Sequence, residues 1–232
     1  MLGEDNILRR SWETALKQWK TLNENEDELQ LKDNARRRRR RKHLQEKQRA
    51  PNIPTLSAKS SVVTPAELVE VMGNVPLRYA GCAWERLFST NVDGVSLGTF
   101  YRRMEDIERP VVMLVRDAEG ACFGCYGEPW RIEKSYYGNG ENFVFTIRPK
   151  QKVWRWTGKN NYFQLGQHDS ISVGGGGKFS LHFDSMFERG SSGICETFNS
   201  PSLASKPRFQ VVVLEAWVLV PRLSKDRYSI SR

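Results

Sequence analysis

The stretch SVGGGGKFSLHFD, residues 172–184, decides between two kinds of fold for this chain. Four glycines followed by a lysine resemble a phosphate cradle, but a P-loop has the form G-x-x-x-x-G-K-[ST] and opens a helix. Counting back from Gly177, its first glycine would be Ser172, and Phe179 stands where a hydroxyl should hold Mg²⁺. The residues that follow are strand-like. The sequence therefore excludes a nucleotide site and predicts a close approach of backbone to backbone before a strand, where a Cβ would not fit.

Short strand-like segments surround this stretch, each rich in aromatic or β-branched residues and bounded by turn residues. They span residues 83–90, 110–118, 121–127, 142–149, 152–158, 162–166, 179–184 and 209–220. Short helices are expected at 64–72, with Thr64 and Glu67 in a capping box, and at 96–104. Many strands with few helices between them predict a mainly β (α+β) fold with flanking helices, built as a two-sheet antiparallel β-sandwich.

An N-terminal arm differs in composition from this unit. Residues 6–31 predict a helical extension, with Trp12 and Trp19 on its apolar face. Residues 35–49 contain nine basic residues and one acid, and so supply about +8 of the net charge of +9. The expected organisation is an amphipathic and polybasic arm at 1–49, a linker at 50–62, a globular domain at 63–220 and a tail at 221–232.

The arm carries the residues that we expect to bind a protein partner. Two tryptophans on a narrow stripe need burial, either against the chain's own domain or in another protein. The arginine run is either a solvated or import-like charge run or an anchor for an acidic surface, and it lacks the interleaved aromatics typical of single-stranded nucleic acid binding. The candidate partner-binding residues are Trp12, Trp19, Arg36, Arg37, Arg38, Arg39, Arg40, Arg41 and Lys42.

The cysteines and histidines predict no metal site and no cofactor. Cys122 and Cys125 have the spacing of a zinc pair, but a second pair is missing, and on a strand they would point to opposite faces. We expect both to be packing residues, and Cys195, in a loop-like stretch, to be the better candidate for a reactive thiol. Residues 1–10 do not read as a secretory signal, and no stretch approaches the ~20 apolar residues of a transmembrane helix. Reduced thiols in a cytoplasmic protein are expected.

The order of the segments resembles the TLDc domain across roughly Val63 to Val220. The matching segments are LFSTNVDGVSLGTFYRRM (87–104), PVVMLVRDAEGACFGCYGEPW (110–130), YYGNGENFVFTIRP (136–149), KVWRWTGKNNYFQLG (152–166), DSISVGGGGKFSLHFD (169–184), GSSGICETFNS (190–200) and LEAWVL (214–219). The resemblance implies a sandwich of two antiparallel sheets flanked by short helices. The sequence departs from the family's usual pattern at Cys125, Ser180, His182 and Ser200, which bears on partner identity more than on the fold.

The resemblance also implies a function. Members are tied to oxidation resistance, and several bind the vacuolar proton-pumping ATPase and regulate its disassembly, without an established reaction. A non-enzymatic interaction module that binds the V1 sector of this ATPase is therefore expected. Glu141 and Asp184 match carboxylates discussed for the family, and Cys195 matches its cysteine, so these three are the candidate catalytic residues if the protein is an enzyme.

The arm suggests an alternative, a structural component of a cytoskeletal assembly such as a microtubule or axoneme. In that case the tryptophan helix would dock into the assembly, and the arginines would contact an acidic surface such as tubulin. The expected location is the cytoplasm, at the cytoskeleton or cilium in the alternative, or at the vacuolar or endolysosomal membrane surface for an ATPase partner.

Overall fold

The computed structural model describes residues 53–221. Its elements are η1 (Pro65–Leu68), α2 (Val69–Asn74), η2 (Leu77–Tyr79), β1 (Ala83–Ser89), α3 (Thr90–Asp93), α4 (Leu97–Arg102), β2 (Val111–Asp117), β3 (Cys122–Gly127), β4 (Phe143–Arg148), β5 (Lys152–Arg155), β6 (Gln164–Gly166), β7 (Ser170–Val173), β8 (Leu181–Asp184), β9 (Arg189–Ser191) and β10 (Arg208–Val220). The helix expected at 6–31, the candidate partner-binding residues Trp12, Trp19 and 36–42, and the tail beyond 221 lie outside the described residues.

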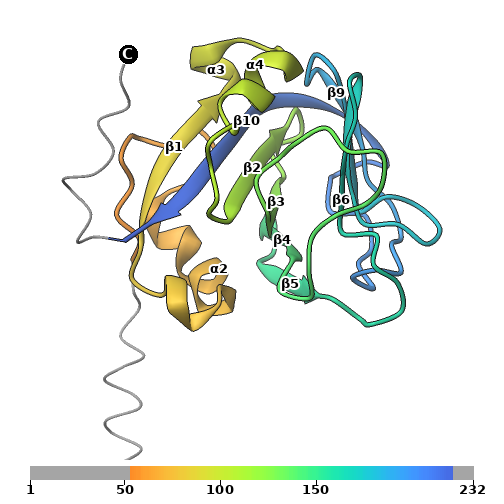
Figure 1. Cartoon of the computed structure of the whole chain (residues 1–232), viewed down its shortest axis with the longest axis horizontal. Coiled ribbons are helices and arrows are strands. Elements are labelled where there is room, and N and C mark those ends of the chain that lie inside the picture. The colour runs from red at the N-terminus through yellow and green to blue at the C-terminus, as the bar shows by residue number, and fades with distance from the viewer. Residues whose placement is uncertain (1–52, 222–232) are drawn as a thin grey trace, which may run out of the picture. The chain divides into compact units, whose positions relative to one another are not determined.

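The strands form two antiparallel sheets, as the sequence predicted, and the two sheets share β10. The hydrogen-bonded order is β5-β4-β3-β2-β10-β9-β8-β7-β6, and β1 also pairs with β10. We call β1 to β5 with β10 the first sheet, and β6 to β9 with the start of β10 the second sheet. Figure 1 shows β10 in blue, running from β1 past β2 toward β9. The fold is therefore mainly β with few helices, in the α+β class.

A bulge in β10 accompanies its passage from one sheet to the other. Residues 208–210 pair with β9, and the pairing with β2 begins at Val211. The register shifts between Val211 and Val213, and the intervening Val212 is exposed. A bulge bends its strand and increases the local twist. This bulge therefore allows β10 to pair with strands of both sheets, which face each other.

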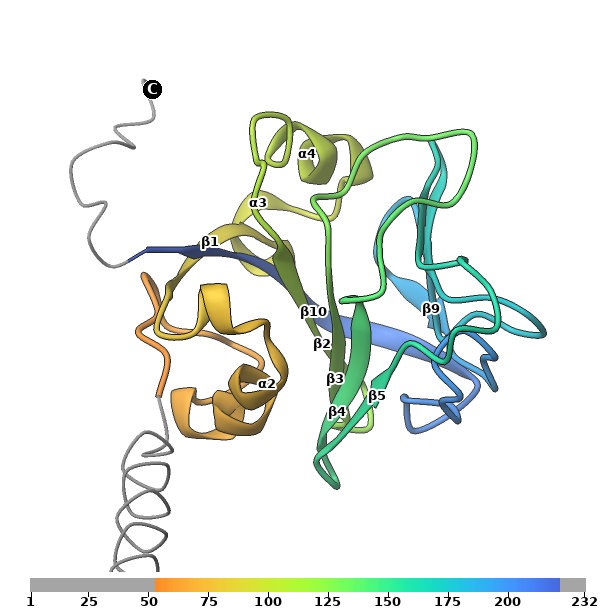
Figure 2. The same ribbon diagram turned by 60° about the horizontal axis from the view of Figure 1, so that its bottom comes forward.

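Two cores lie on opposite faces of the first sheet. Along β2, Met113 points into the core between the sheets, and its neighbour Leu114 points into the core under η1 and α2. On β3, Cys125 lies in the core between the sheets and Cys122 in the other, as expected for strand residues three apart. Figure 2 shows α2 on one side of the first sheet and β9 on the other. Both thiols are buried and pack among apolar side chains.

The described part of the expected linker packs against the domain. Leu56 forms a parallel bridge with Trp84 of β1, and the backbone N–H of Ser57 donates to the carbonyl of Trp84 at 2.8 Å. Ser60 is buried, and its hydroxyl donates to Glu215 of β10 at 2.7 Å. The composition of residues 50–62 suggested a linker, but residues 55–57 pair with the edge strand β1, which offers free backbone groups there.

The expected helix at 64–72 forms as a 3-10 turn, η1, followed by α2. Its N-terminus has the predicted cap, since the carboxylate of Glu67 accepts a hydrogen bond from the backbone N–H of Thr64 at 2.8 Å. The apolar face, including Leu68, Val71 and Met72, is buried in the core between these helices and the first sheet. The helix at 96–104 is present as α4, with Ser96 as its N-cap.

Candidate functional site

A cavity of about 760 Å³ lies where three separate segments meet. We call it the Glu141 cavity. Its walls come from η2, from the stretch between Tyr101 and Pro110 that includes the end of α4, and from residues 126–142, which comprise the end of β3 and the connection to β4. The lining combines aromatic rings, apolar side chains and charged groups of both signs, which is typical of a binding site for a ligand or a protein side chain.

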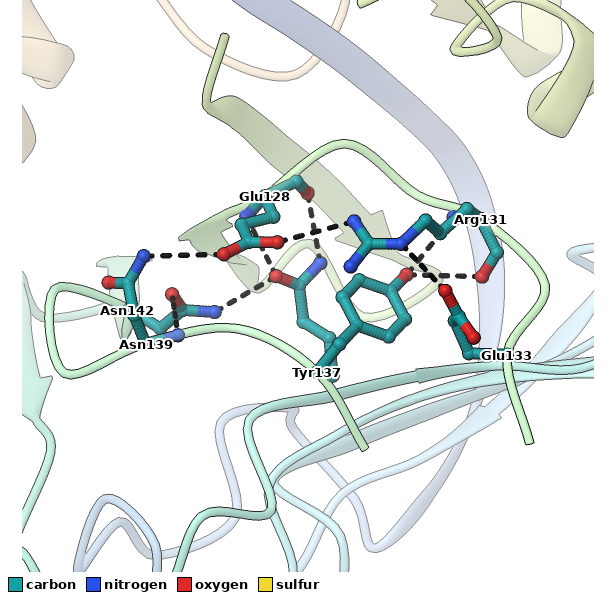
Figure 3. A network of polar contacts seen from close by, with 7 residues as sticks. Glu128, Arg131, Glu133, Tyr137, Asn139 and Asn142 are labelled. Atoms are coloured by element: carbon teal, nitrogen blue, oxygen red, sulfur yellow. Dashed lines mark hydrogen bonds and ion pairs between the residues drawn. The ribbon is translucent and has the colours of Figure 1, made fainter. Parts of the chain in front are cut away.

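A polar network holds the 128–142 connection in one shape (Figure 3). The guanidinium of Arg131 donates to Glu128 at 3.2 Å and to Glu133 at 3.0 Å. The same group lies 4.1 Å from the centre of the Tyr137 ring, within the range of a cation–π contact. The Tyr137 hydroxyl also contacts the backbone of Arg131, accepting from its N–H at 3.1 Å. The loop wall is thus fixed by side chains together with a backbone bridge between Tyr137 and Gln164 of β6.

Gln164 of β6 joins this loop to the second sheet. Its side chain is almost fully buried; its amide oxygen accepts from the Glu128 backbone N–H at 2.8 Å and from Asn142 at 2.9 Å. Its amide nitrogen donates to the Glu128 carbonyl at 3.1 Å. A Cβ on Gly127 would lie 2.2 Å from the Gln164 amide oxygen, so only glycine permits this close approach. Sequence reasoning missed Gln164, because a glutamine in a short strand has no distinguishing pattern.

The candidate carboxylate Glu141 lies at the mouth of the cavity in an ion pair with Arg78. Nη1 of Arg78 donates to Oε1 of Glu141 at 2.6 Å, and Nη2 donates to Oε2. The hydrogen bond from Arg78 lowers the pKa of Glu141, and the same bond raises the pKa of the guanidinium. Both side chains are substantially exposed, at 56% for Arg78 and 40% for Glu141. Glu141 is therefore an ionised, paired surface group, rather than a proton donor held for acid catalysis.

Tyr126 contributes a buried hydroxyl to the same cavity. Its side chain is 2% exposed and stacks on Phe143 at 4.9 Å between ring centres. Its oxygen is inaccessible to solvent and has no hydrogen-bond partner among residues 53–221. Burial raises the pKa of Tyr126, so the hydroxyl keeps its proton at neutral pH. A buried hydroxyl that is left unpaired costs free energy, and a ligand or partner side chain that reached it would remove that cost.

The second candidate carboxylate, Asp184, ends β8 and holds the turn that follows. Its Oδ1 accepts from the backbone N–H of Glu188 at 3.1 Å, and its carbonyl accepts from Phe187 at 3.2 Å. Phe187 has a φ of 52° and is buried, so the aspartate stabilises a conformation that L-residues rarely adopt. Asp184 also lines a different cavity, of about 550 Å³, on the second sheet.

Cys195 lies in the core and explains the glycine run. Its thiol is fully buried and donates to the carbonyl of Gly175 at 3.5 Å. A Cβ on Gly174, which has a φ of 76°, would lie 2.4 Å from the sulfur of Cys195, and a Cβ on Gly175 would lie 2.9 Å from Tyr162. The expected close approach is therefore real, but at Gly174 and Gly175 it is to side chains rather than to backbone. A buried thiol is also a poor target for peroxide, which attacks exposed thiolates.

The three candidate catalytic residues are not brought together. Glu141 lines one cavity, Asp184 another, and Cys195 is in the core. Within the described range, no group of three or more His, Cys, Asp or Glu side chains is placed to hold a metal ion. Over the same residues, no helix is long and apolar enough to cross a membrane. The residues that the fold does gather are Arg78, Tyr126 and Glu141, from segments up to 63 positions apart.

Comparison with known proteins identifies the domain. The TLDc domain family matches residues 56–220, so the chain belongs to the TLDc family. Its relatives include oxidation resistance protein 1 of Bos taurus, 36% identical over 166 residues, and nuclear receptor coactivator 7 of Mus musculus, 35% identical over 167 residues. Each alignment covers 71% of this chain but only 19% and 18% of the relatives. The chain thus spans about a fifth of the length of the curated relatives that it matches.

Proposed function

We propose that this chain is a non-enzymatic protein-binding module that acts in resistance to oxidative stress by binding the V1 sector of the vacuolar-type proton ATPase. The family supports the stress role, since a relative that shares the whole domain is named for oxidation resistance. ATPase binding is what the resemblance to other TLDc members implies. Binding to V1 would recruit the protein to the vacuolar or endolysosomal membrane surface.

The observation that carries the proposal is the construction of the Glu141 cavity. An exposed ion pair at its mouth, Arg78 with Glu141, offers charges of both signs, and Tyr126 lines the cavity with its unpaired hydroxyl buried behind the surface. Aromatic and apolar groups, including Trp130, line the rest. A partner side chain with an apolar body and a polar tip would suit this arrangement, as is common at the centre of protein interfaces. The carboxylate that matches the family then serves recognition rather than catalysis.

Binding of purified full-length chain to isolated V1 tests the proposal. We expect saturable binding by biolayer interferometry, and at least a tenfold loss of affinity for Glu141→Arg, which places two cationic groups at the mouth. Lys159→Ala is the matched control, because Lys159 is an exposed charged residue outside the cavity lining. Wild-type affinity in Glu141→Arg would show that the cavity is not the contact, and no V1 binding by the unmodified chain would refute the ATPase partner.

The composition of the arm favours a second candidate, a structural role in a cytoskeletal assembly. Residues 35–49 hold almost all of the chain's net positive charge, and the preceding segment carries two tryptophans on one predicted face. In this case the full chain should pellet with microtubules at low salt and be released at high salt, because exposed ion pairs are screened. Pelleting that does not depend on salt, or on residues 35–49, would refute the arginine contact.

A further inference from the structure

A row of polar side chains crosses the second sheet on the face opposite the core between the sheets. Ser172 of β7 lies opposite His182 of β8, and His182 lies opposite Ser191 of β9. Ser191 in turn lies opposite Arg208 of β10. Strand side chains alternate between faces, and Phe183, next to His182, is fully buried in the core between the sheets. The row therefore faces away from that core.

The imidazole of His182 is held in a defined orientation. Its Nδ1 lies 2.9 Å from the hydroxyl oxygen of Ser172, and the ring of Phe179 stacks on it, 5.3 Å away at an interplanar angle of 20°. Burial lowers the pKa of His182, and this effect outweighs the nearby charges of Asp184 and Asp169, which raise it. The ring is therefore neutral at pH 7. When Ser172 donates to Nδ1, the remaining proton is on Nε2, and this N–H is free to donate to a ligand.

A hollow lies along this row, and two arginines border it. We call it the Arg208 cavity; it has a volume of about 550 Å³. Ser191 is short and lies between the longer side chains of His182 and Arg208, whose strands flank β9. Arg189 lies opposite Gln210, diagonal to Arg208. Among the described residues, the side chains of Arg189 and Arg208 form no hydrogen bond and no ion pair, so both guanidinium groups are available.

The charges in this cavity favour an anion. Lys206 and Glu119 at the rim pair with each other and cancel. Asp184 is the other carboxylate in the lining, and one of its oxygens already accepts from the backbone of Glu188. The two unpaired arginines are positively charged and Asp184 is negatively charged. The lining of the cavity therefore has a net charge of +1 when His182 is counted as neutral.

We propose that this cavity binds a phosphate monoester carried on a serine or threonine of a partner protein. Three donors from three adjacent strands, on His182, Ser191 and Arg208, match the three terminal oxygens of a phosphate group, whereas a carboxylate presents two. Arg189 adds a second cationic group for the nearly doubly charged phosphate. The proposal does not depend on V1 binding, because it concerns a different cavity.

The surroundings of the row favour a protein as the source of the phosphate over a membrane. The lining includes one large apolar side chain, Phe209, which is buried in the core, and beside it the partly exposed ring of Phe179 stacks on His182, so the row offers one exposed apolar ring. A membrane-binding surface needs exposed apolar side chains for insertion, or a cluster of about four to eight basic residues. Three basic residues, of which Lys206 is already paired, fall short of that number.

Titration of the ¹⁵N-labelled full-length chain with three peptides tests the proposal. The probes are acetyl-Ala-Gly-X-Gly-Ala-amide, where X is phosphoserine, serine or glutamate. We expect saturable shifts of the His182 ring and Arg208 side-chain signals with the phosphoserine peptide, at least tenfold weaker binding of the glutamate peptide, and none of the serine peptide. Inorganic phosphate should compete at the same signals.

Variants make the result specific. The double variant Arg189→Gln/Arg208→Gln should weaken phosphopeptide binding at least tenfold, and Ser191→Ala should weaken it without changing the charge. Lys159→Gln, which removes a positive charge outside the cavity, should bind as the unmodified chain does. Unchanged core signals in each spectrum establish that the variants are folded.

Two results would overturn the proposal. One is equal affinity of the arginine double variant and the unmodified chain for the phosphoserine peptide. The other is the absence of saturable shifts with that peptide. If phosphatidylcholine vesicles that contain phosphatidylinositol 4-phosphate then bind, the cavity is assigned to a lipid headgroup instead.

Discussion

The hydroxyl of Ser60 donates a hydrogen bond of 2.7 Å to the carboxylate of Glu215, which lies 155 positions further along the chain. Glu215 is fully buried, and it also accepts from the backbone N–H of Ser61 at 2.7 Å and from the indole of Trp217 at 3.1 Å. Three donors offset the loss of hydration of a buried charge. This contact fastens the start of the domain to the strand that runs through both sheets.

Removing that carboxylate should destabilise the domain. We expect Glu215→Ala to lower the free energy of unfolding by about 3 kcal/mol, because three donors lose their acceptor, and Ser60→Ala by about 1–2 kcal/mol. Urea unfolding followed by tryptophan fluorescence measures both. The matched control is Lys59→Ala, an exposed neighbour, which should change the value by less than about 0.5 kcal/mol. A similarly small change in Glu215→Ala would mean that the contact does not hold this segment in place.

Two glycine substitutions should have opposite effects on stability. A Cβ on Gly124 of β3 would lie 1.9 Å from the carbonyl oxygen of Met113 and 2.8 Å from the ring of Phe145. Gly124→Ala should therefore separate β3 from β2 and cost about 3 kcal/mol. A Cβ on Gly98 in α4 would meet only the Ser96 hydroxyl at 3.7 Å, so Gly98→Ala should stabilise by about 0.5–1 kcal/mol. Thermal unfolding of both variants checks the contrast, and a stable Gly124→Ala would contradict it.

The Arg78–Glu141 pair should make part of the stability depend on pH. The pKa of Glu141 is lowered in the folded chain, so its contribution is present above its ordinary value of 4.5 and is lost as the pH falls through the folded value. Arg78→Gln should therefore be less stable than the unmodified chain at pH 7. That difference should be smaller at pH 3 than at pH 7, because pH 3 lies below the ordinary pKa of glutamate and the contribution of the pair is already being lost there.

Urea midpoints at the two pH values test the dependence on pH. Lys159→Gln serves as the control, because this exposed lysine forms no ion pair through its side chain within residues 53–221. We expect its difference from the unmodified chain to be the same at both pH values. A constant difference for Arg78→Gln as well would contradict the ion pair.

Tyr126→Phe should separate stability from binding. The hydroxyl is buried without a partner among the described residues, so its removal should leave the melting temperature unchanged or raise it. The same variant should weaken V1 binding, because the partner loses the only buried polar group that we assign to the contact. Such opposed effects are typical of functional positions. A clear fall in the melting temperature would show that the hydroxyl is satisfied in the free protein.

The sequence predicted the sandwich because many short segments rich in aromatic and β-branched residues, with few helices between them, indicate packed antiparallel sheets. The opposite orientation of Cys122 and Cys125 followed from strand geometry alone. Two strands were missed: β7 is four residues long, and β9 is Arg-Gly-Ser, which has no apolar residue to show a period. β9 pairs as a strand because β8 and β10 lie on either side of it.

The cavities could not be predicted from local pattern. Arg78, Tyr126 and Glu141 come from three segments that only the folded chain brings together, and none of the three stands in a distinctive spacing. Glu215 stands in the middle of an apolar strand, and its role depends on Ser60 at the other end of the domain. Sequence pattern identifies which face of a strand is buried, whereas contacts between distant segments depend on the topology.

The affinity of the purified full-length chain for isolated V1, compared with that of the Glu141→Arg and Tyr126→Phe variants, tests the central claim most directly. The account predicts saturable binding by the unmodified chain, a loss of at least tenfold in Glu141→Arg, a smaller loss in Tyr126→Phe, and unchanged binding in Lys159→Ala. Absence of V1 binding by the unmodified chain, or equal affinity of all four proteins, would contradict it.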